Sequence, residues 1–318
     1  MEGEVVAVTL QQLSYAIAVA EEGSISRAAA RLYIAQPSLT GAIAALEKEA
    51  GIRIFLRTSR GVIPTAEGAD FLIYARQVCQ QYELLLDRYG HPKRRRKFGV
   101  STQHYSFAVK AFVDTVKEYD TLDFDFAIRE TRTDEVIRDV GMLRSELGIL
   151  FLSDFNRKII TRLLADHELE FYRLIDCKAY VYLWKDHPLA AEKAIRFEQL
   201  RDYPCLSFEQ GERSSLFLAE EILAENDYPR VIRTTDRATM LNLMIGLNGY
   251  TLCSGIICEE LNGSDYRAVP FEDDEANRNS VMEIGYITKK YAVLSDIGET
   301  YIAAVRAYLD GAQNGSQP

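Results

Sequence analysis

Hydrogen-bonding side chains of the types that read DNA bases cluster where a helical pattern begins. Gln36, Ser38 and Thr40 lie within the first turns of the segment QPSLTGAIAALEKEA. A glutamine can bond an adenine edge through two hydrogen bonds, and serine and threonine hydroxyls can bond several base edges. These residue types at the start of a helix indicate sequence readout in a DNA groove.

The burial pattern of the same segment places its small residues on the outside. Leu39, Ile43 and Leu46 form an apolar stripe with helical spacing. At about 100° per residue, three small residues face away from that stripe: Pro37, Gly41 and Ala44. A glycine inside a helix costs about 1 kcal/mol relative to alanine, and close approach of this face to DNA would offset that cost. The alternative is a helical hairpin of an enzyme, in which the small face packs on another helix.

The elements that would position these residues can be delimited from their caps. Thr9 followed by Gln12 forms a capping box, and Gly23 ends the first helix. Ser24 can cap a second, short helix, and Pro37 suits the first turn of a third, which Gly51 ends. The segments IRIFLRT and GVIPT flank SRG and predict two strands joined by a turn. Residues 9–65 are therefore predicted to form three helices and a β-wing, in which Arg57, Thr58, Ser59 and Arg60 suit phosphate or minor-groove contacts.

A long helix is predicted after Thr65. Its apolar residues follow a 4–3 spacing over almost three heptads, at Phe71, Ala75, Val78, Tyr82, Leu85 and Tyr89. This seam favours dimerisation, and packing on the chain's own body is the alternative. The charged segment HPKRRRK at 91–97 marks the predicted domain boundary.

Composition and charge point to a soluble protein with two unlike parts. The chain has 318 residues, 47% hydrophobic and 26% charged, and no apolar run as long as the ~18 residues of a membrane helix. Its net charge is −10, but residues 1–97 carry 13 Lys and Arg against 10 Asp and Glu. A mildly basic head on an acidic body fits a local DNA contact. The first residues lack a basic stretch, so no secretory signal is expected, and the odd number of scattered cysteines predicts a reduced, cytoplasmic chain.

Enzymatic motifs are missing from the sequence. The four histidines do not pair at metal-ligand spacing, and no phosphate-binding loop, G-x-S-x-G or dinucleotide fingerprint occurs. No catalytic residue, metal or cofactor is predicted. His187 in the turn DHPLA is expected to be structural, and each cysteine is expected to be a small buried side chain.

Residues after 97 alternate between strand and helix patterns, which predicts an α/β body of parallel sheets covered by helices on both faces. Because ligands bind beyond the carboxyl ends of such strands, polar residues at strand ends are candidate contacts. The helix start after Ser101, Thr102 and Gln103 suits a carboxylate or another anion. The remaining candidates are Glu130, Thr131, Phe151, Ser207, Thr235 and Ser254. The alternative for each serine and threonine is an ordinary helix cap.

Residues 10–68 resemble the winged helix-turn-helix of LysR-type transcriptional regulators. The resemblance is carried by the S-x-x-x-A-A-x-x-L pattern at 24–32, Q-P-S-L at 36–39, I-x-x-L-E at 43–47, G-I-R-I-F-L-R at 51–57 and T-A-E-G at 65–68. The body matches this family more loosely. The predicted DNA-binding residues are Ser26, Arg27, Gln36, Pro37, Ser38, Thr40, Gly41, Arg57, Ser59 and Arg60.

The resemblance implies a homotetramer, built as a dimer of dimers, that binds double-stranded promoter DNA and responds to a small-molecule effector between two lobes. It implies a DNA-binding domain at 9–67, a linker helix at 68–92 and a periplasmic-binding-protein-like effector domain at 93–310, followed by a flexible tail at 311–318. Lobe I is placed at 93–168 and 273–310, and lobe II at 169–270.

Two alternative functions stay open at this stage. The acidic body is compatible with a small-molecule-binding module whose head contacts protein rather than DNA. Cys205 could make the chain a redox sensor, although peroxide-sensing relatives need a second cysteine nearby in sequence, and this chain has none.

Overall fold

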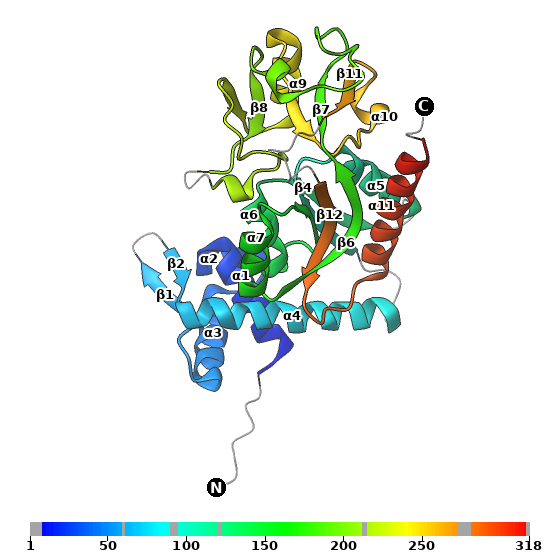
Figure 1. The fold of residues 1–318 in the computed structure, drawn as a ribbon. Helices are drawn as coiled ribbons and strands as arrows, with labels where there is room; N and C mark the ends of the chain where they lie inside the picture. The colour runs from blue at the N-terminus through cyan, green and yellow to red at the C-terminus, as the bar shows by residue number, and fades with distance from the viewer. Residues whose placement is uncertain are drawn as a thin grey trace. The chain divides into compact units, whose positions relative to one another are not determined.

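The computed structural model describes residues 8–58, 61–89, 95–119, 123–211, 215–272 and 281–315 (Figure 1). The chain divides into two compact units, Met1–Arg94 and Arg95–Pro318. The division falls within the charged segment 91–97 that predicted a boundary.

The first unit holds four helices and a two-stranded hairpin among its described residues. They are α1 (Leu10–Glu22), α2 (Ile25–Arg31), α3 (Gln36–Ala50), β1 (Phe55–Thr58), β2 (Gly61–Pro64) and α4 (Ala66–Tyr89). The predicted capping box is present, since the Thr9 and Gln12 side chains each accept a hydrogen bond from the other residue's backbone N–H. Gly23 and Gly51 adopt the left-handed conformation that ends α1 and α3. The predicted winged helix-turn-helix is therefore confirmed.

The core of the first unit comes from the predicted stripe. Leu39, Ile43 and Leu46 of α3 are buried together with alanines of α1 and α2. The beginning of α4 belongs to the same core, through Leu72 and Ala75. Further along α4, three residues of the predicted seam are exposed: Val78 at 49%, Tyr82 at 41% and Leu85 at 55%.

The second unit contains two lobes. Lobe I consists of β3 (Arg96–Thr102), α5 (Ser106–Glu118), β4 (Phe124–Glu130), α6 (Thr133–Gly141), β5 (Leu147–Leu152), α7 (Arg157–Asp166), β6 (Leu169–Lys178), β12 (Val281–Lys289) and α11 (Asp296–Gly315). Its sheet has the order β4-β3-β5-β12-β6, in which β3 is parallel to β4 and β5 while β12 is antiparallel to β5 and β6.

Helices cover both faces of this sheet, with α5 and α11 on one side and α6 and α7 on the other (Figure 1). The central strand β5 is buried along its whole length. Its residues Leu147, Ile149 and Phe151 pack toward α5 and α11, whereas Leu150 and Leu152 pack toward α6 and α7. A strand buried on both faces explains why β5 is a continuous apolar run.

Lobe II contains smaller sheets. Its elements are β7 (Tyr180–Trp184), α8 (Phe197–Leu200), β8 (Cys205–Phe208), the 3₁₀ turn η1 (Leu216–Leu218), β9 (Val231–Thr234), α9 (Arg237–Leu247), β10 (Thr251–Cys253), α10 (Glu259–Asn262) and β11 (Tyr266–Pro270). Strands β10, β7 and β11 form an antiparallel sheet, and β8 pairs with β9 in parallel. The prediction of parallel sheets is therefore wrong for the pairs that β12 makes and for this three-stranded sheet.

Two predicted boundaries differ from the structure. The division at 168/169 assigned β6 to lobe II, but β6 pairs along the whole of β12 in the sheet of lobe I. Helix α11 runs to Gly315, into the segment 311–318 that was predicted to be a tail, and residues 316–318 lie outside the described part.

The sequence of residues 214–226 has the apolar spacing of a helix, but the structure forms no such helix there among the described residues. Only the turn η1 is helical in the described part of that segment, and residues 220–226 form bends and turns. Glu220 and Glu221 are buried there, where they accept hydrogen bonds from the backbone N–H groups of His104 and Phe208. These contacts compete with continuation of the helix.

Candidate functional sites

The outer face of α3 is open. Gln36, Pro37, Ser38 and Gly41 are exposed, and a Cβ atom added at Gly41 would meet nothing within 4 Å. The predicted orientation of the helix is thus confirmed, and its small residues leave the backbone accessible on that side.

Hydrogen bonds already fix part of this face. The Ser26 hydroxyl of α2 donates to Gln36 Oε1 at 2.9 Å, which holds the amide at the beginning of α3. The Thr40 hydroxyl donates to the Gln36 carbonyl within its own helix at 3.0 Å. Arg27 is exposed and donates to the Glu22 carbonyl at the end of α1.

The wing contributes one described arginine. Arg57 of β1 is exposed, whereas Ser59 and Arg60 lie outside the described residues. Tyr33, in the turn before α3, is 96% exposed and has a positive φ of 55°. The sequence patterns place Tyr33 in a turn but do not indicate its exposure.

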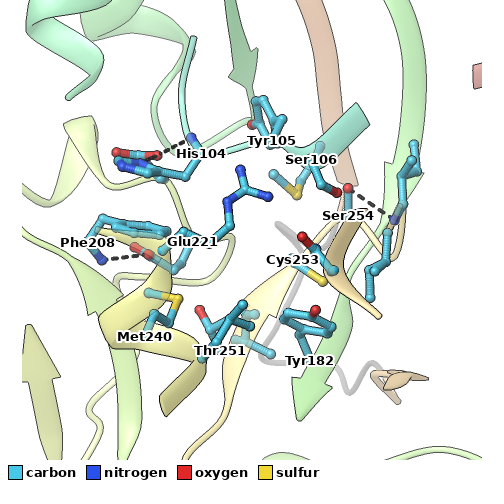
Figure 2. Close-up of a pocket in the computed structure, with 18 residues that line it drawn as sticks. His104, Tyr105, Ser106, Tyr182, Phe208, Glu221, Met240, Thr251, Cys253 and Ser254 are labelled. Atoms are coloured by element: carbon cyan, nitrogen blue, oxygen red, sulfur yellow. Dashed lines mark hydrogen bonds and ion pairs between the residues drawn. The ribbon is translucent and has the colours of Figure 1, made fainter. Parts of the chain in front are cut away.

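A small cavity lies between the two lobes of the second unit (Figure 2). Its volume is about 80 Å³, which is enough for several waters or one small organic molecule. His104, Tyr105 and Ser106 at the beginning of α5 face Met240, Thr251 and Tyr182 of lobe II in this view.

Of the predicted effector contacts, Ser254 lines this cavity and is buried. Glu130 lies next to it, because its carboxylate accepts a hydrogen bond from Arg237, which does line the cavity. Ser207 instead lines a second cavity, of about 210 Å³, within lobe II.

The other predicted contacts lie outside the cavity lining. Ser101, Thr102 and Gln103 are buried, with hydrogen bonds to protein partners. The backbone N–H of the buried residue Phe151 donates to Gln103 Oε1, the Thr131 hydroxyl bonds Glu135, and Thr235 is exposed. A direct role of these residues in ligand binding stays a prediction.

Acidic and basic groups face each other across the lobes. Glu220 of lobe II accepts hydrogen bonds from the backbone N–H and the ring Nδ1 of His104, both at 2.8 Å, and from the Gln210 amide at 2.9 Å. The His104 ring stacks on Phe208 with centroids 3.7 Å apart. Arg237, the first residue of α9, pairs with Glu130 at the end of β4. The sequence patterns do not reveal the contacts of His104 with Glu220 and of Glu130 with Arg237, because each pair is separated by more than 100 positions.

Burial changes the ionisation of two further groups in the cavity. Burial, with the charge of Glu220 in support, raises the pKa of Glu221 to about 8, so this carboxyl is protonated at neutral pH. Burial also raises the pKa of the Cys253 thiol to about 12. Both groups are therefore uncharged at pH 7.

The other titratable residues singled out in the sequence, Cys205 and His187, have surroundings that favour structural roles. Burial raises the pKa of Cys205 to about 12, which opposes a peroxide-reactive thiolate, and all five cysteines are free. His187 is buried, and its ring bonds the Asn248 carbonyl and the Leu189 N–H. Within the described residues, no cluster of three metal-ligating side chains occurs, and no helix has the length and apolar character needed to cross a bilayer.

A winged helix-turn-helix joined to a two-lobed α/β body with a cavity between its lobes defines the architecture of a DNA-binding regulator with a ligand-binding domain. Two protein-family models match segments of this chain and agree with this architecture. Residues 10–69 match the bacterial regulatory helix-turn-helix protein of the lysR family, and residues 122–309 match the LysR substrate binding domain. The chain belongs to the LysR family and is a DNA-binding transcriptional regulator.

Individual relatives agree with this assignment. The chain is 28% identical over 258 residues to the Hca operon transcriptional activator HcaR of Escherichia coli, a match that covers 77% of this chain and 81% of HcaR. It is 51% identical over 74 residues to the regulator ClcR of Pseudomonas putida, covering 23% of this chain and 25% of ClcR. A full-length OxyR variant from Pseudomonas aeruginosa shares the fold, with a TM-score of 0.64 at 17% identity, covering 95% of this chain and 94% of the OxyR chain.

Proposed function

We propose that this regulator binds double-stranded promoter DNA in the cytoplasm as a homodimer that assembles into a homotetramer, and that a small-molecule effector in the inter-lobe cavity controls transcription. The observation that carries the proposal is the cavity itself, which lies between two lobes that the chain connects twice, before β7 and before β12. A ligand there contacts both lobes and can therefore change their arrangement.

The DNA part of the proposal is supported by the open face of α3. Gln36, held by Ser26, and Ser38 are the groups on that face that can bond base edges. A footprint at a pseudo-palindromic site near the regulator's own gene is the expected result. Gel shifts with a random genomic library separate this function from a protein-contacting head, which would enrich no DNA.

Arg57→Ala is expected to weaken binding to all DNA sequences alike and to reduce the slope of log affinity against log salt by about one. Arg57 is exposed on the wing, where it can neutralise a phosphate. The slope is measured by fluorescence anisotropy over a salt series, with Arg162→Ala in the second unit as the control for net charge. An unchanged slope would remove Arg57 from the DNA contacts.

Dimerisation through α4 is supported by the exposed seam of Val78, Tyr82 and Leu85. Leu85→Lys is expected to weaken the dimer on the order of a hundredfold, because a charge would be buried without a partner. Sedimentation measures the change, and Gln80→Lys on the opposite side of the helix is the control. Equal dissociation of both variants would place the interface elsewhere.

A screen of metabolites by thermal shift tests the effector part, since a molecule that binds the native state raises the melting temperature. An effector must also change the footprint or the transcription of the target. Binding without either change would contradict the effector role.

A further inference from the structure

An arginine lines the cavity between the lobes, and a carboxylate of the protein already pairs with it. Arg237 is the only arginine or lysine among the described residues that line the cavity. The Arg237 side chain is 21% exposed, and its guanidinium bonds the carboxylate of Glu130, a residue whose side chain is 26% exposed and does not line the cavity. Glu130 ends β4 in lobe I and Arg237 begins α9 in lobe II, so the ion pair ties the two lobes together.

The acidic residues of the cavity leave Arg237 available for an anion. Glu220 is saturated by hydrogen bonds from His104 and Gln210. Glu221 is protonated at neutral pH because burial raises its pKa to about 8. Glu220 keeps its charge but is bound by these other partners, and the carboxylate that pairs with the permanent positive charge of Arg237 is that of Glu130, from outside the cavity.

A second polar group in the same cavity has no well-formed hydrogen bond. The Tyr182 side chain is about nine-tenths buried, and its hydroxyl has no hydrogen-bond partner of normal geometry among the described residues. The Asn262 amide, which also lines the cavity, interacts with this hydroxyl only loosely. In Figure 2 the Tyr182 ring lies at the lobe II side of the cavity. Buried polar atoms are satisfied in most proteins, so such a hydroxyl at a cavity indicates a site for water or a ligand.

The rest of the lining is largely apolar. Met240 and Leu241 of α9 and Ile256 and Ile257 after β10 contribute aliphatic side chains. A ligand that matches this lining has an acidic group, a compact apolar body and a group that can bond a phenol. The volume limits it to a small molecule.

We propose, on the basis of the effector role inferred above, that Arg237 binds the acidic group of a small amphipathic carboxylate and that Glu130 is the internal counter-ion which this ligand displaces. The displaced carboxylate turns to solvent, to which it is already partly exposed. Ligand entry therefore breaks one ion pair between the lobes, which gives the bound and free states different inter-lobe contacts.

The test compares carboxylic acids with their uncharged amides on the full-length protein. Benzoate, hexanoate and cyclohexanecarboxylate are titrated against benzamide, hexanamide and cyclohexanecarboxamide by calorimetry and thermal shift. The variants are Glu130→Gln and Arg237→Gln, with Glu118→Gln and Arg230→Gln as matched changes of charge elsewhere in lobes I and II. Fluorescence of Trp184, the single tryptophan of the chain, verifies folding of the second unit.

The acids are expected to bind Glu130→Gln on the order of tenfold more tightly than the wild type, because the competing carboxylate is gone. Arg237→Gln is expected to lose the preference for acids over amides, and the double variant is expected to bind acids no better than Arg237→Gln alone. The two control variants should behave as the wild type does.

Two results would overturn the inference: acids that bind Arg237→Gln as tightly as the wild type, or the absence of acid binding to Glu130→Gln. Neither result bears on the effector role itself. An uncharged metabolite that changes the DNA footprint would leave the proposed function intact and remove the anion site. An acid that binds the variants as expected but leaves the DNA footprint unchanged would support the anion site and contradict the effector role.

Discussion

Gly68→Ala is expected to unfold the DNA-binding unit while the second unit stays folded. A Cβ atom at position 68 would lie 2.0 Å from the Ile54 carbonyl oxygen and 2.7 Å from its carbon. That carbonyl accepts a hydrogen bond from the Thr65 N–H at 2.9 Å, and the Thr65 hydroxyl accepts one from the Gly68 N–H at 2.8 Å. The added methyl group would collide with backbone atoms, so no side chain can move aside to make room. We therefore expect the first unit to lose about 3 kcal/mol or more of its free energy of unfolding.

The two units report separately on this prediction. Trp184 lies in the second unit, so its fluorescence transition should be unchanged in the variant. The helical circular dichroism of α1 to α4 should be lost at a lower denaturant concentration or temperature, and DNA binding should be lost with it.

Gly41→Ala is the matched control, because it adds the same methyl group inside a helix of the same unit. That methyl group meets nothing within 4 Å, so the first unit should gain about 1 kcal/mol of stability. DNA affinity should fall nevertheless if the groove approaches this face. If Gly68→Ala and the wild type melted at the same temperature, α4 and the backbone at Ile54, just before β1, would have to lie further apart than in the structure.

The first unit could be predicted from the sequence because local signals set its elements. Thr9 with Gln12, and then Gly23, Pro37 and Gly51, fix helix ends through contacts within a few residues. The stripe from Leu39 gave the buried face of α3 for the same reason.

The second unit could be predicted only in part, because its sheets join distant segments. Strand β6 lacks a clear apolar alternation, and it is held by β12 more than 100 positions away. The segment at 214–226 has a helical pattern, but the bonds of Glu220 and Glu221 to His104 and Phe208 replace the helix. Local propensity yields to tertiary contacts at such positions.

The rule that ligands bind beyond strand ends led to the neighbourhood of the cavity, but of the residues that it selected only Ser254 lines the cavity. Ser101 and Thr102 form the buried end of β3, and Gln103 directly after it is buried as well. The next three residues along the chain line the cavity. In lobe II the rule selected Thr235, which does not line the cavity, whereas Arg237 at the start of α9 does. Which side chain enters a cavity depends on the turn after each strand, and the sequence patterns do not define that turn.

Glu221→Gln is expected to abolish a pH dependence of stability that the wild type shows between about pH 4.5 and 8. The pKa of Glu221 is raised from its ordinary value of 4.5 to about 8 by burial. Below pH 4.5 the carboxyl is protonated in both the folded and the unfolded chain. As the pH rises, the unfolded chain loses this proton first, so the folded state binds more protons and the wild type loses stability until about pH 8.

Glutamine at position 221 keeps an oxygen that can accept the Phe208 N–H, which Glu221 now bonds at 2.8 Å, but it carries no proton to lose. Relative to wild type, the variant should gain roughly 2–4 kcal/mol at pH 8.5 and little near pH 4.5. Denaturant unfolding followed by Trp184 fluorescence measures the difference, with Glu198→Gln as the exposed control. Because ionised Glu221 would add a negative charge to the cavity of Arg237, acids should also bind the wild type more weakly above pH 8 but bind the variant equally across this range. Parallel stability profiles of variant and wild type would mean that Glu221 is already ionised at neutral pH.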